Sequence, residues 1–380
     1  MNRAHRAVIR GTGVFTPAHR ISNDELVASF NEHVRRENAR NAEAIAAGTA
    51  KALAPSSVEF IEKASGIRAR YVMDRSGILD PDRMAPSLPE RPESELSLQA
   101  EMSVEAAREA IERAGCGPRD IDLVIVACSN TQRPYPAIAI EVQHALGIEE
   151  AYAYDMNVAC SSATFGIQNA ADAVRSGSAR RVLMVNPEIC SGHLDFRDRD
   201  CHFIFGDVCT AVVIERGDLA TEDGRGGTWE IVSSRLRTAF SNNIRNDSGF
   251  LDRWDGSSPG ARNKLFHQEG RKVFKEVCPL VAAQILSHLE EAGVPVEDIR
   301  RLWLHQANLQ MNELISRRVL GREPSREEAP VVLDEYANTS SAGSVIAFHK
   351  HRDDLEVGAT GVLCSFGAGY SIGSVILRRC

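Results

Sequence analysis

Three residues in this chain have side chains of the types used in acyl transfer through a thioester, and each lies beside an apolar stretch. Cys160 lies in "MNVACSSATFG" (156–166), His305 ends the run "LWLH", and Asn338 lies in "YANTSSAG". The small residues after Cys160 can open a helix. A helix N-terminus stabilises a thiolate through its dipole and free N–H groups. We therefore expect the Cys160 thiol to have a lowered pKa and its N–H group to form half of an oxyanion hole.

Each of these residues also has a structural interpretation, which stays open at this point. Free cysteine is among the most buried residue types, and the chain has nine cysteines. A histidine beside an apolar run is more often a core residue than a catalyst, and an asparagine in a loop is commonly a turn or N-cap residue. The closest two cysteines are eight positions apart, so we expect reduced thiols rather than a zinc pair or a disulfide pattern.

The elements that must position these residues follow an α/β pattern. Hydrophobic periodicity, capping residues and proline content distinguish them. In chain order we predict a strand over 6–17, a helix that begins with a capping box at Ser22 and Glu25, a helical stretch over 39–54, an exposed loop over 80–97, a helix over 98–114 and a strand over 121–127. Strands that alternate with helices imply right-handed crossovers and largely parallel sheets.

An internal repeat relates the two parts of the chain. Residues 110–130, "AIERAGCGPRDIDLVIVACSN", align without a gap with residues 288–308, "HLEEAGVPVEDIRRLWLHQAN", at an offset of 178. At the same offset Cys160 falls on Asn338, and "ACSSATFG" lies over "ANTSSAGS". His305 falls on an alanine of the first half, so the fold itself does not require an imidazole at that position.

The repeat predicts two similar α/β halves, residues 1–217 and 218–380. The first half contains Cys160 and the segments 31–55 and 80–97, and the second contains His305 and Asn338. Because Cys160 and Asn338 are related by the repeat, we expect the three polar residues to meet where the halves pack together. The glycine-rich "FGAGYSIG" near the C-terminus is interpreted as a tight turn before the last strand, and the N–H group of Ala368 there can supply a second oxyanion donor.

Composition excludes several classes of protein. The net charge of −8 and the isoelectric point near 5.8 disfavour a general nucleic-acid binder, which needs a basic stripe. No window approaches the 18 or so uninterrupted apolar residues of a membrane span, and charges interrupt the N-terminus where a signal peptide would be apolar. We expect a cytoplasmic protein without membrane insertion.

The motifs taken together resemble the thiolase-fold condensing enzymes, most closely the β-ketoacyl-acyl carrier protein synthase III group. The resemblance covers nearly the whole chain. It rests on "NVACSSATFGIQ", "FIFGD" with Asp207, "LHQANLQM", "YANTSSAGS" and "SFGAGYSIGS". It implies an α/β thiolase-like fold, with the two halves in a five-layered αβαβα arrangement.

The resemblance also implies a mechanism. Cys160 would take an acyl group from an acyl thioester such as acyl-CoA, while the N–H groups of Cys160 and Ala368 hold the oxyanion. His305 and Asn338 would bind the malonyl thioester of acyl carrier protein (ACP) and stabilise the enolate formed as carbon dioxide leaves. The carbanion would then attack the acyl-cysteine. No metal or redox cofactor is implied, and Phe205 and Asn308 are expected in the substrate pocket.

Partners follow from the same resemblance. The family is homodimeric, and Tyr135 in "TQRPYP" would reach the acyl pocket of the partner subunit. "GRKVFKEV" resembles the basic helix that docks ACP, which implies that role for Arg271, Lys272 and Lys275. No nucleic acid is implied.

Three positions depart from the usual family pattern near the coenzyme A entrance. Phe60 takes the place of a stacking tryptophan, and Ala64 and Gln310 take the places of basic residues. The longer segments 31–55 and 80–97 also fall near that entrance. These departures favour a longer acyl donor, or a different carrier, over acetyl-CoA.

Three alternatives remain at the level of sequence. One is an acyltransferase of the same fold that moves the acyl group to an alcohol or amine. Another is a papain-like hydrolase, which also uses Cys, His and Asn in that order, although its local "CGSCW"-type signature is absent. The third is a carrier-protein-binding module without catalytic activity.

Overall fold

Nine strands of the protein form one mixed sheet. The structure, a computed structural model, describes residues 6–220, 227–249, 251–254, 256–258 and 260–380. The strands of the large sheet are, in spatial order, β11 (Ile299–Leu304), β12 (Thr360–Gly367), β13 (Gly369–Arg379), β8 (Trp229–Ser241), β1 (Ala7–Phe15), β7 (Asp207–Arg216), β6 (Arg181–Ile189), β4 (Leu123–Ala127) and β5 (Tyr152–Met156). Two small pairs complete the described strands, β2 (His19–Ser22) with β3 (Ala69–Val72) and β9 (Ile244–Arg245) with β10 (His267–Gln268).

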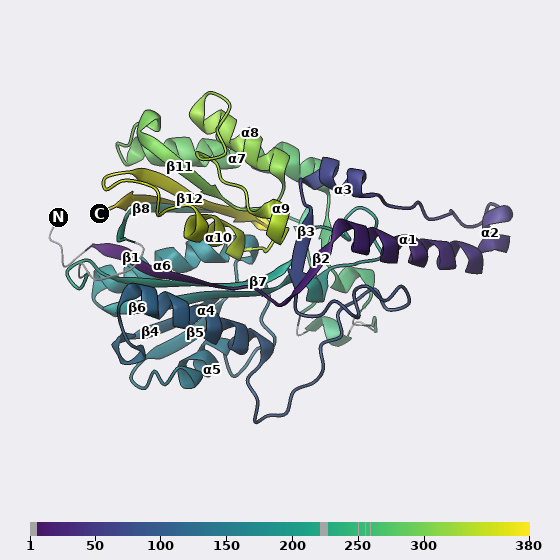
Figure 1. Ribbon diagram of the computed structural model, residues 1–380, viewed down its shortest axis with the longest axis horizontal. Coiled ribbons are helices and arrows are strands. Elements are labelled where there is room, and N and C mark those ends of the chain that lie inside the picture. Colours follow the sequence, from purple (N-terminus) through teal and green to yellow (C-terminus); the bar gives the residue numbers. More distant parts are fainter. Residues whose placement is uncertain (1–5, 221–226, 250, 255, 259) are drawn as a thin grey trace.

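Helices separate and cover the two parts of this sheet. They are α1 (Asn23–Arg40), α2 (Ala42–Ala46), α3 (Val58–Ser65), α4 (Leu98–Ala114), α5 (Ile138–Ala145), α6 (Ser162–Ser176), α7 (Gly270–Glu291), α8 (Leu309–Leu320), α9 (Leu333–Tyr336) and α10 (Ala342–Lys350). Helices α6 and α10 lie between the halves, α4 and α5 cover one outer face, and α7 and α8 cover the other (Figure 1). The five-layered αβαβα arrangement is therefore confirmed.

A short seam joins the two halves of the sheet. β1 and β8 pair only where Val8 and Ile9 face Glu230 and Trp229. In the layer between the halves, the rings of Trp229, Trp303 and Phe348 pack edge to face, with centroids 4.9 to 5.5 Å apart. This cluster fixes α10 against the C-terminal strands.

The strand directions match the prediction in part. β4 is parallel to β5 and β6, and β11 is parallel to β12, while the other neighbours in the large sheet are antiparallel. The parallel pairs are those joined by crossover helices. β13 is antiparallel because a tight turn connects it directly to β12.

The internal repeat is visible in the backbone. Gly115 ends α4 with φ 68°, and Gly293 follows α7 with φ 64°. A 3₁₀ turn then leads into the strand in both halves, at Pro118–Asp120 and at Val296–Asp298. The offset of 178 residues thus relates equivalent structural positions.

The predicted helix over 98–114 and the capping box are confirmed. The Ser22 N–H donates to Glu25 Oε2 at 2.9 Å and opens α1. The helix predicted over 39–54 is wrong beyond residue 46. α2 ends at Ala46, and Gly48 then turns the chain with φ 71° toward an extended return that contains Pro55. Residues 81–97 contain neither helix nor strand, as predicted.

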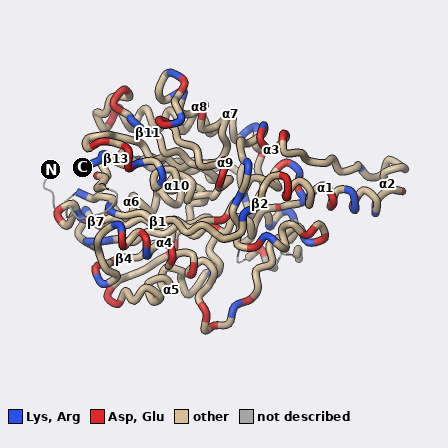
Figure 2. Tube along the Cα trace, viewed as in Figure 1, with Lys and Arg blue, Asp and Glu red and all other residues tan. Residues whose placement is uncertain are grey.

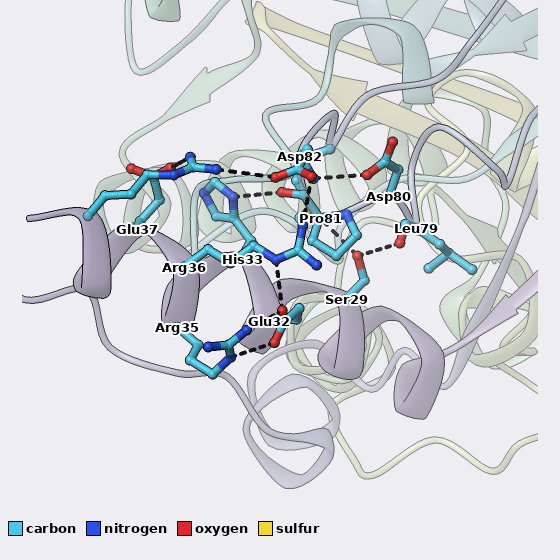
Figure 3. Close-up of polar contacts among 12 residues, drawn as sticks. Ser29, Glu32, His33, Arg35, Arg36, Glu37, Leu79, Asp80, Pro81 and Asp82 are labelled. Carbon is cyan, nitrogen blue, oxygen red and sulfur yellow. Dashed lines mark hydrogen bonds and ion pairs between the residues drawn. The ribbon is translucent and has the colours of Figure 1, made fainter.

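The two longer segments contact each other outside the layered body. α1, α2 and the returning residues 47–57 form an arm that projects from the molecule (Figure 1). Asp82 of the second segment forms ion pairs with Arg36 at 2.7 Å and Arg40 at 3.3 Å, and His33 Nδ1 lies 2.9 Å from the Pro81 carbonyl (Figure 3). Figure 2 shows acidic and basic residues interspersed over the elements of both halves.

Candidate active site

Cys160 and Asn338 occupy the same unusual turn in the two halves. Cys160 lies in a 3₁₀ turn, Ala159–Ser161, directly before α6, and Asn338 lies between α9 and α10. The preceding residues, Ala159 and Ala337, have φ values of 47° and 58°. This left-handed region is rarely adopted by residues with a Cβ, and such strain concentrates at functional sites. The fold thus keeps a costly turn at both positions.

Ser340 connects the three predicted catalytic residues. Its hydroxyl donates to Cys160 Sγ at 3.5 Å, and its N–H donates to Asn338 Oδ1 at 2.9 Å. Its backbone also lies close enough to the His305 imidazole to raise the pKa of that ring. Contact with one residue brings Cys160, His305 and Asn338 together at the junction of the halves, as the repeat predicts.

The expectation of a lowered pKa for Cys160 is wrong for the free site. Burial raises the pKa of the thiol to about 11, and the nearby Glu188 raises it further, while the Ser340 hydroxyl lowers it. α6 begins only at Ser162, and the loss of solvation outweighs the stabilising N–H groups. The free site therefore holds a thiol near neutral pH, so a thiolate requires proton transfer.

His305 is a buried, neutral imidazole. It follows β11, where its backbone N–H donates to the Cys364 carbonyl at 2.7 Å, and its ring packs edge-on against Phe366, with the ring centroids 5.1 Å apart. Burial lowers its pKa to about 4, and the nearby Ser340 backbone offsets this only in part. Its Nδ1 has no hydrogen-bond partner among the described residues. A neutral imidazole can donate one hydrogen bond and accept a proton.

Asn338 is oriented by its own loop. Its backbone bridges to the strand-like segment around Phe205, because its N–H donates to the Ile204 carbonyl at 2.9 Å and its carbonyl accepts from Gly206 at 3.1 Å. Since Oδ1 accepts from Ser340, the amide group keeps its two N–H donors for another acceptor. The same bridge places Phe205 next to Asn338.

The two predicted oxyanion donors converge. The backbone N–H groups of Cys160 and Ala368 both lie near the Cys160 sulfur, where each lowers the pKa of the thiol. Ala368 lies in the tight connection between β12 and β13. A Cβ on the preceding Gly367 would lie 2.6 Å from Cys160 Cβ and 3.1 Å from Cys160 Sγ, so only glycine lets this connection approach the cysteine.

Phe60 lies at the junction of the arm and the body. The Arg199 guanidinium lies 3.9 Å from the centre of the Phe60 ring, and Phe203 packs against the ring edge at 5.8 Å. Arg199 Nε also donates to the Pro55 carbonyl at 2.7 Å. The returning residues 47–57 of the arm therefore fix the Arg199 guanidinium that stacks on Phe60.

The remaining predicted residues lie further out. The side chain of Asn308 caps α8, accepting from Gln310 at 2.9 Å, and donates to the Ala64 carbonyl at 2.7 Å. Its amide is thus engaged in joining α8 to α3. Tyr135 is 78% exposed in the loop between β4 and α5. The side chains of the basic cluster on the first turns of α7 are exposed, at Arg271, Lys272 and Lys275.

Sequence reasoning missed Ser340, Arg199 and Glu188. Ser340 lies inside the "YANTSSAG" motif, but no spacing rule distinguishes it from its serine and threonine neighbours. Arg199 belongs to a loop without hydrophobic periodicity. Glu188 lies near the end of an apolar strand, and an acidic residue inside such a strand is the signal that could have identified it. The nine cysteines are free thiols, as predicted.

The described residues contain neither a metal-binding cluster nor a membrane-spanning helix. Among them, no group of three or more His, Cys, Asp or Glu side chains is placed to hold a metal ion. Likewise, none of their helices is both long and apolar enough to cross a membrane.

Comparisons with known proteins identify the family. Residues 154–238 match 3-oxoacyl-[acyl-carrier-protein (ACP)] synthase III, and residues 289–379 match the C-terminal part of the same family. A Pseudomonas aeruginosa protein named beta-ketodecanoyl-[acyl-carrier-protein] synthase is 65% identical over 351 residues, which is 92% of this chain and 99% of the relative. The chain belongs to the 3-oxoacyl-ACP synthase III family. The predicted family and its class, a condensing acyltransferase, are confirmed.

Other members of the synthase III family agree over the full length. A beta-ketoacyl-[acyl-carrier-protein] synthase III of Agrobacterium fabrum is 29% identical over 378 residues, 98% of this chain and 99% of the relative. The crystal structure of the Aquifex aeolicus 3-oxoacyl-[acyl-carrier-protein] synthase III matches with a TM-score of 0.74 at 25% identity, covering 98% of this chain and 99% of that one. The priming beta-ketosynthase of the R1128 polyketide pathway matches with a TM-score of 0.77 at 25% identity, covering 100% and 98%. The thiolase-like fold is confirmed.

Proposed function

We propose that this synthase III condenses an acyl thioester with malonyl-ACP through an acyl-Cys160 intermediate. The observation that carries the proposal is the contact of Ser340 with Cys160, His305 and Asn338. It unites a nucleophile with two hydrogen-bonding groups at the junction of the halves. The products are a β-ketoacyl-ACP, carbon dioxide and the free thiol of the donor, and the proposed reaction uses no cofactor.

In the first half-reaction, Cys160 Sγ attacks the carbonyl carbon of the acyl thioester. The thiol must lose its proton, since its pKa is about 11. Burial lowers the pKa of His305 to about 4, so His305 is a weak base and takes this proton only as the new carbon–sulfur bond forms. The N–H groups of Cys160 and Ala368 stabilise the oxyanion. The carbon–sulfur bond to the donor breaks, the donor thiolate takes up a proton, and the acyl group stays on Sγ.

In the second half-reaction, malonyl-ACP binds with its thioester carbonyl between His305 and Asn338. Both side chains donate hydrogen bonds to the enolate oxygen that develops as the carboxylate leaves as carbon dioxide. A neutral imidazole suits this step, because it already holds the proton that it donates. The carbanion attacks the acyl carbon, and the Cys160 thiolate leaves.

The donor that we propose is a medium-chain acyl-CoA. The Pseudomonas relative is named for a β-ketodecanoyl product. Condensation adds the two carbons that remain of malonyl, so that product requires an octanoyl donor. The departures at Phe60, Ala64 and Gln310 agree with a donor other than acetyl-CoA. The Phe60 and Arg199 pair offers a stacking surface at the expected coenzyme A entrance.

Intact-mass spectrometry tests the nucleophile and the donor together. The protein is mixed with acetyl-, octanoyl- or lauroyl-CoA, and the adduct is followed with time. We expect the octanoyl adduct to form fastest and to be absent from Cys160→Ala. Malonyl-ACP should then release it as β-ketodecanoyl-ACP. No adduct with any acyl-CoA or acyl-ACP, or the same adduct on the variant, would refute the acyl-Cys160 mechanism.

We propose a homodimer formed through β5. This strand is the last in the sheet, and Tyr152 at its start is 46% exposed. Asp155 of β5 accepts the N–H groups of Ile138 and Ala139 at 2.8 Å, so the loop that presents Tyr135 is fixed beside this edge. Pairing of two β5 edges would carry each Tyr135 toward the partner subunit.

Two further expectations also stay proposals. ACP would dock on Arg271, Lys272 and Lys275, although Lys272 already pairs with Glu269. A cytoplasmic location is still a prediction.

The fold and the reaction product separate the alternatives that the sequence left open. The thiolase-like fold excludes a papain-like hydrolase. Product mass would distinguish acyl transfer to an alcohol or amine, since only condensation loses carbon dioxide.

A further inference from the structure

Glu188 is a buried carboxylate beside the proposed active site. It lies near the end of β6 and is 1% exposed. Its negative charge is felt by Cys160, whose pKa it raises. No step of the proposed mechanism uses it, yet burying a carboxylate costs several kcal/mol unless donors compensate. The donors that compensate the Glu188 carboxylate come from two loops of the proposed active site.

Four donors from two separate loops converge on this carboxylate. The Ser129 hydroxyl donates at 2.5 Å and the Ser129 N–H at 3.1 Å. The Ser341 hydroxyl donates at 2.5 Å and the Ser341 N–H at 3.2 Å. Ser129 opens the loop that leads to Tyr135, and Ser341 follows the loop that contains Asn338 and Ser340.

The same connection extends to the nucleophile. The Ser129 carbonyl accepts from Asn157 Nδ2 at 2.7 Å, and Asn157 Oδ1 accepts the Ala159 N–H at 2.9 Å. Ala159 precedes Cys160 and has the left-handed φ that forms the turn. Glu188 therefore connects, through Ser129, to the Cys160 turn and, through Ser341, to the Asn338 loop.

We propose that Glu188 is a positioning residue that, as a carboxylate, holds the Cys160 turn and the Asn338 loop in register for decarboxylation and condensation. The inference rests on the proposed function. Transfer of the acyl group to Cys160 uses the cysteine, its oxyanion donors and His305, whereas decarboxylation and attack on the acyl-cysteine also need the Asn338 loop in register with the cysteine. A displacement of about 1 Å can reduce such a step by about a hundredfold.

The Glu188→Gln variant tests the need for a carboxylate. Gln has nearly the same shape, but its NH2 group cannot accept a hydrogen bond. Serine hydroxyls can rotate to accept from it, but backbone N–H groups cannot. An NH2 group in place of Oε1 would face the N–H groups of both Ser129 and Ser341, and one in place of Oε2 would face the Ser129 N–H, which lies 3.3 Å from that oxygen. We expect the rate of malonyl-ACP decarboxylation to fall at least about tenfold relative to the rate of octanoyl-Cys160 formation. Ser341→Ala should lower the same ratio by a smaller factor.

A pH profile separates this role from a merely structural one. Burial raises the pKa of Glu188 to about 7, and its serine hydrogen bonds lower it only in part. Below that pH Glu188 is protonated and loses acceptor capacity, so wild-type decarboxylation should decline on the acid side of pH 7. Glu188→Gln should show no such decline.

Of the other titratable groups around Glu188, the thiols titrate well above pH 7, whereas Asp207 titrates close to Glu188. The thiols of Cys128, Cys160, Cys190 and Cys209 surround it, and burial raises the pKa of each. Asp207 acts on Cys190, and burial raises the pKa of Asp207 to about 6. An acid-side decline that persists in Glu188→Gln would therefore assign the titration to Asp207 and overturn the proposal.

Glu215→Gln is the matched control. Glu215 is also 1% exposed and lies on β7, but it pairs with Arg181 and Arg10 away from the site. It should lower the thermal midpoint without changing the ratio of decarboxylation to acylation. An unchanged ratio in both Glu188→Gln and Ser341→Ala would overturn the inference. Failure of the wild type to form acyl-Cys160 would instead refute the proposed function.

Discussion

Gly367→Ala perturbs the closest approach between the turn after β12 and the nucleophile. The added Cβ would lie 2.6 Å from Cys160 Cβ and 3.1 Å from Cys160 Sγ. Ordinary contacts between such atoms are 3.4 to 4 Å, so the cysteine or the turn must move by about 1 Å. Gly367 does not have a positive φ, so its backbone conformation is open to residues with a side chain. Alanine would therefore act by its volume and not by backbone strain.

The displacement should affect acylation more than stability. A shift of about 1 Å removes the sulfur from alignment with the N–H groups of Cys160 and Ala368. Loss of an oxyanion donor costs about 10² to 10³ in rate, and a misplacement of 1 Å about 10². We expect octanoyl-Cys160 formation to slow by about a hundredfold. Overpacking should cost the fold about 1–3 kcal/mol.

Gly361→Ala is the control on the same strand. Its Cβ would lie 2.4 Å from the Trp303 ring, in the core and away from Cys160. It should destabilise the protein at least as much as Gly367→Ala but acylate at nearly the wild-type rate. The assay is the initial rate of adduct formation by intact-mass spectrometry, with thermal unfolding measured on both variants. Wild-type acylation by Gly367→Ala, or equal losses in both variants, would refute the reasoning.

Other predictions follow from the same geometry. The rate of Cys160 alkylation by iodoacetamide should rise about tenfold per pH unit from 8 to 10, because the pKa near 11 keeps the thiolate a minor species. Ser340→Ala should slow this alkylation, since it removes a hydrogen bond that lowers the pKa of the thiol. A plateau of the rate below pH 8 would contradict both expectations. His305→Ala should abolish malonyl-ACP decarboxylation in the pre-formed acyl-enzyme, measured as carbon dioxide release, and full decarboxylation would remove His305 from the mechanism. Arg199→Ala should raise the KM for octanoyl-CoA with little change in the maximal acylation rate, and an unchanged KM would show that the stacked pair does not bind the donor. Glu215→Ala should lower the free energy of unfolding by about 3 kcal/mol in urea titrations, since it removes the carboxylate that faces the buried Arg10 and the partly exposed Arg181. A loss below about 1 kcal/mol would show that the site relaxes.

Several features were predictable because they depend on local sequence. The capping box at Ser22 and the helix over 98–114 follow from side chains that act within a few residues. The repeat predicted that Cys160 and Asn338 are equivalent, since two halves with one pattern fold into one architecture. Alanine content over 39–54 predicted too long a helix, because helix propensity is weak and no packing partner sustains the helix beyond Gly48.

The electrostatics of the site depended on tertiary packing. The helix start after Cys160 predicted a lowered pKa, but residues from both halves pack around the cysteine and the resulting desolvation dominates. Glu188 lies near the end of β6, among apolar residues, and its four serine donors come from residues 59 positions before it and 153 after it. No spacing rule reaches that far.

The sequence by itself determined the types of the three reactive residues, their order, and the repeat that relates Cys160 to Asn338. Only the tertiary structure decided that Ser340 contacts all three, that Gly367 lies against the cysteine, and that Arg199 stacks on Phe60. The physical reason is that side-chain type and periodicity are local properties of the chain. Contact, desolvation and the pKa values that follow from them depend on which distant segments pack together.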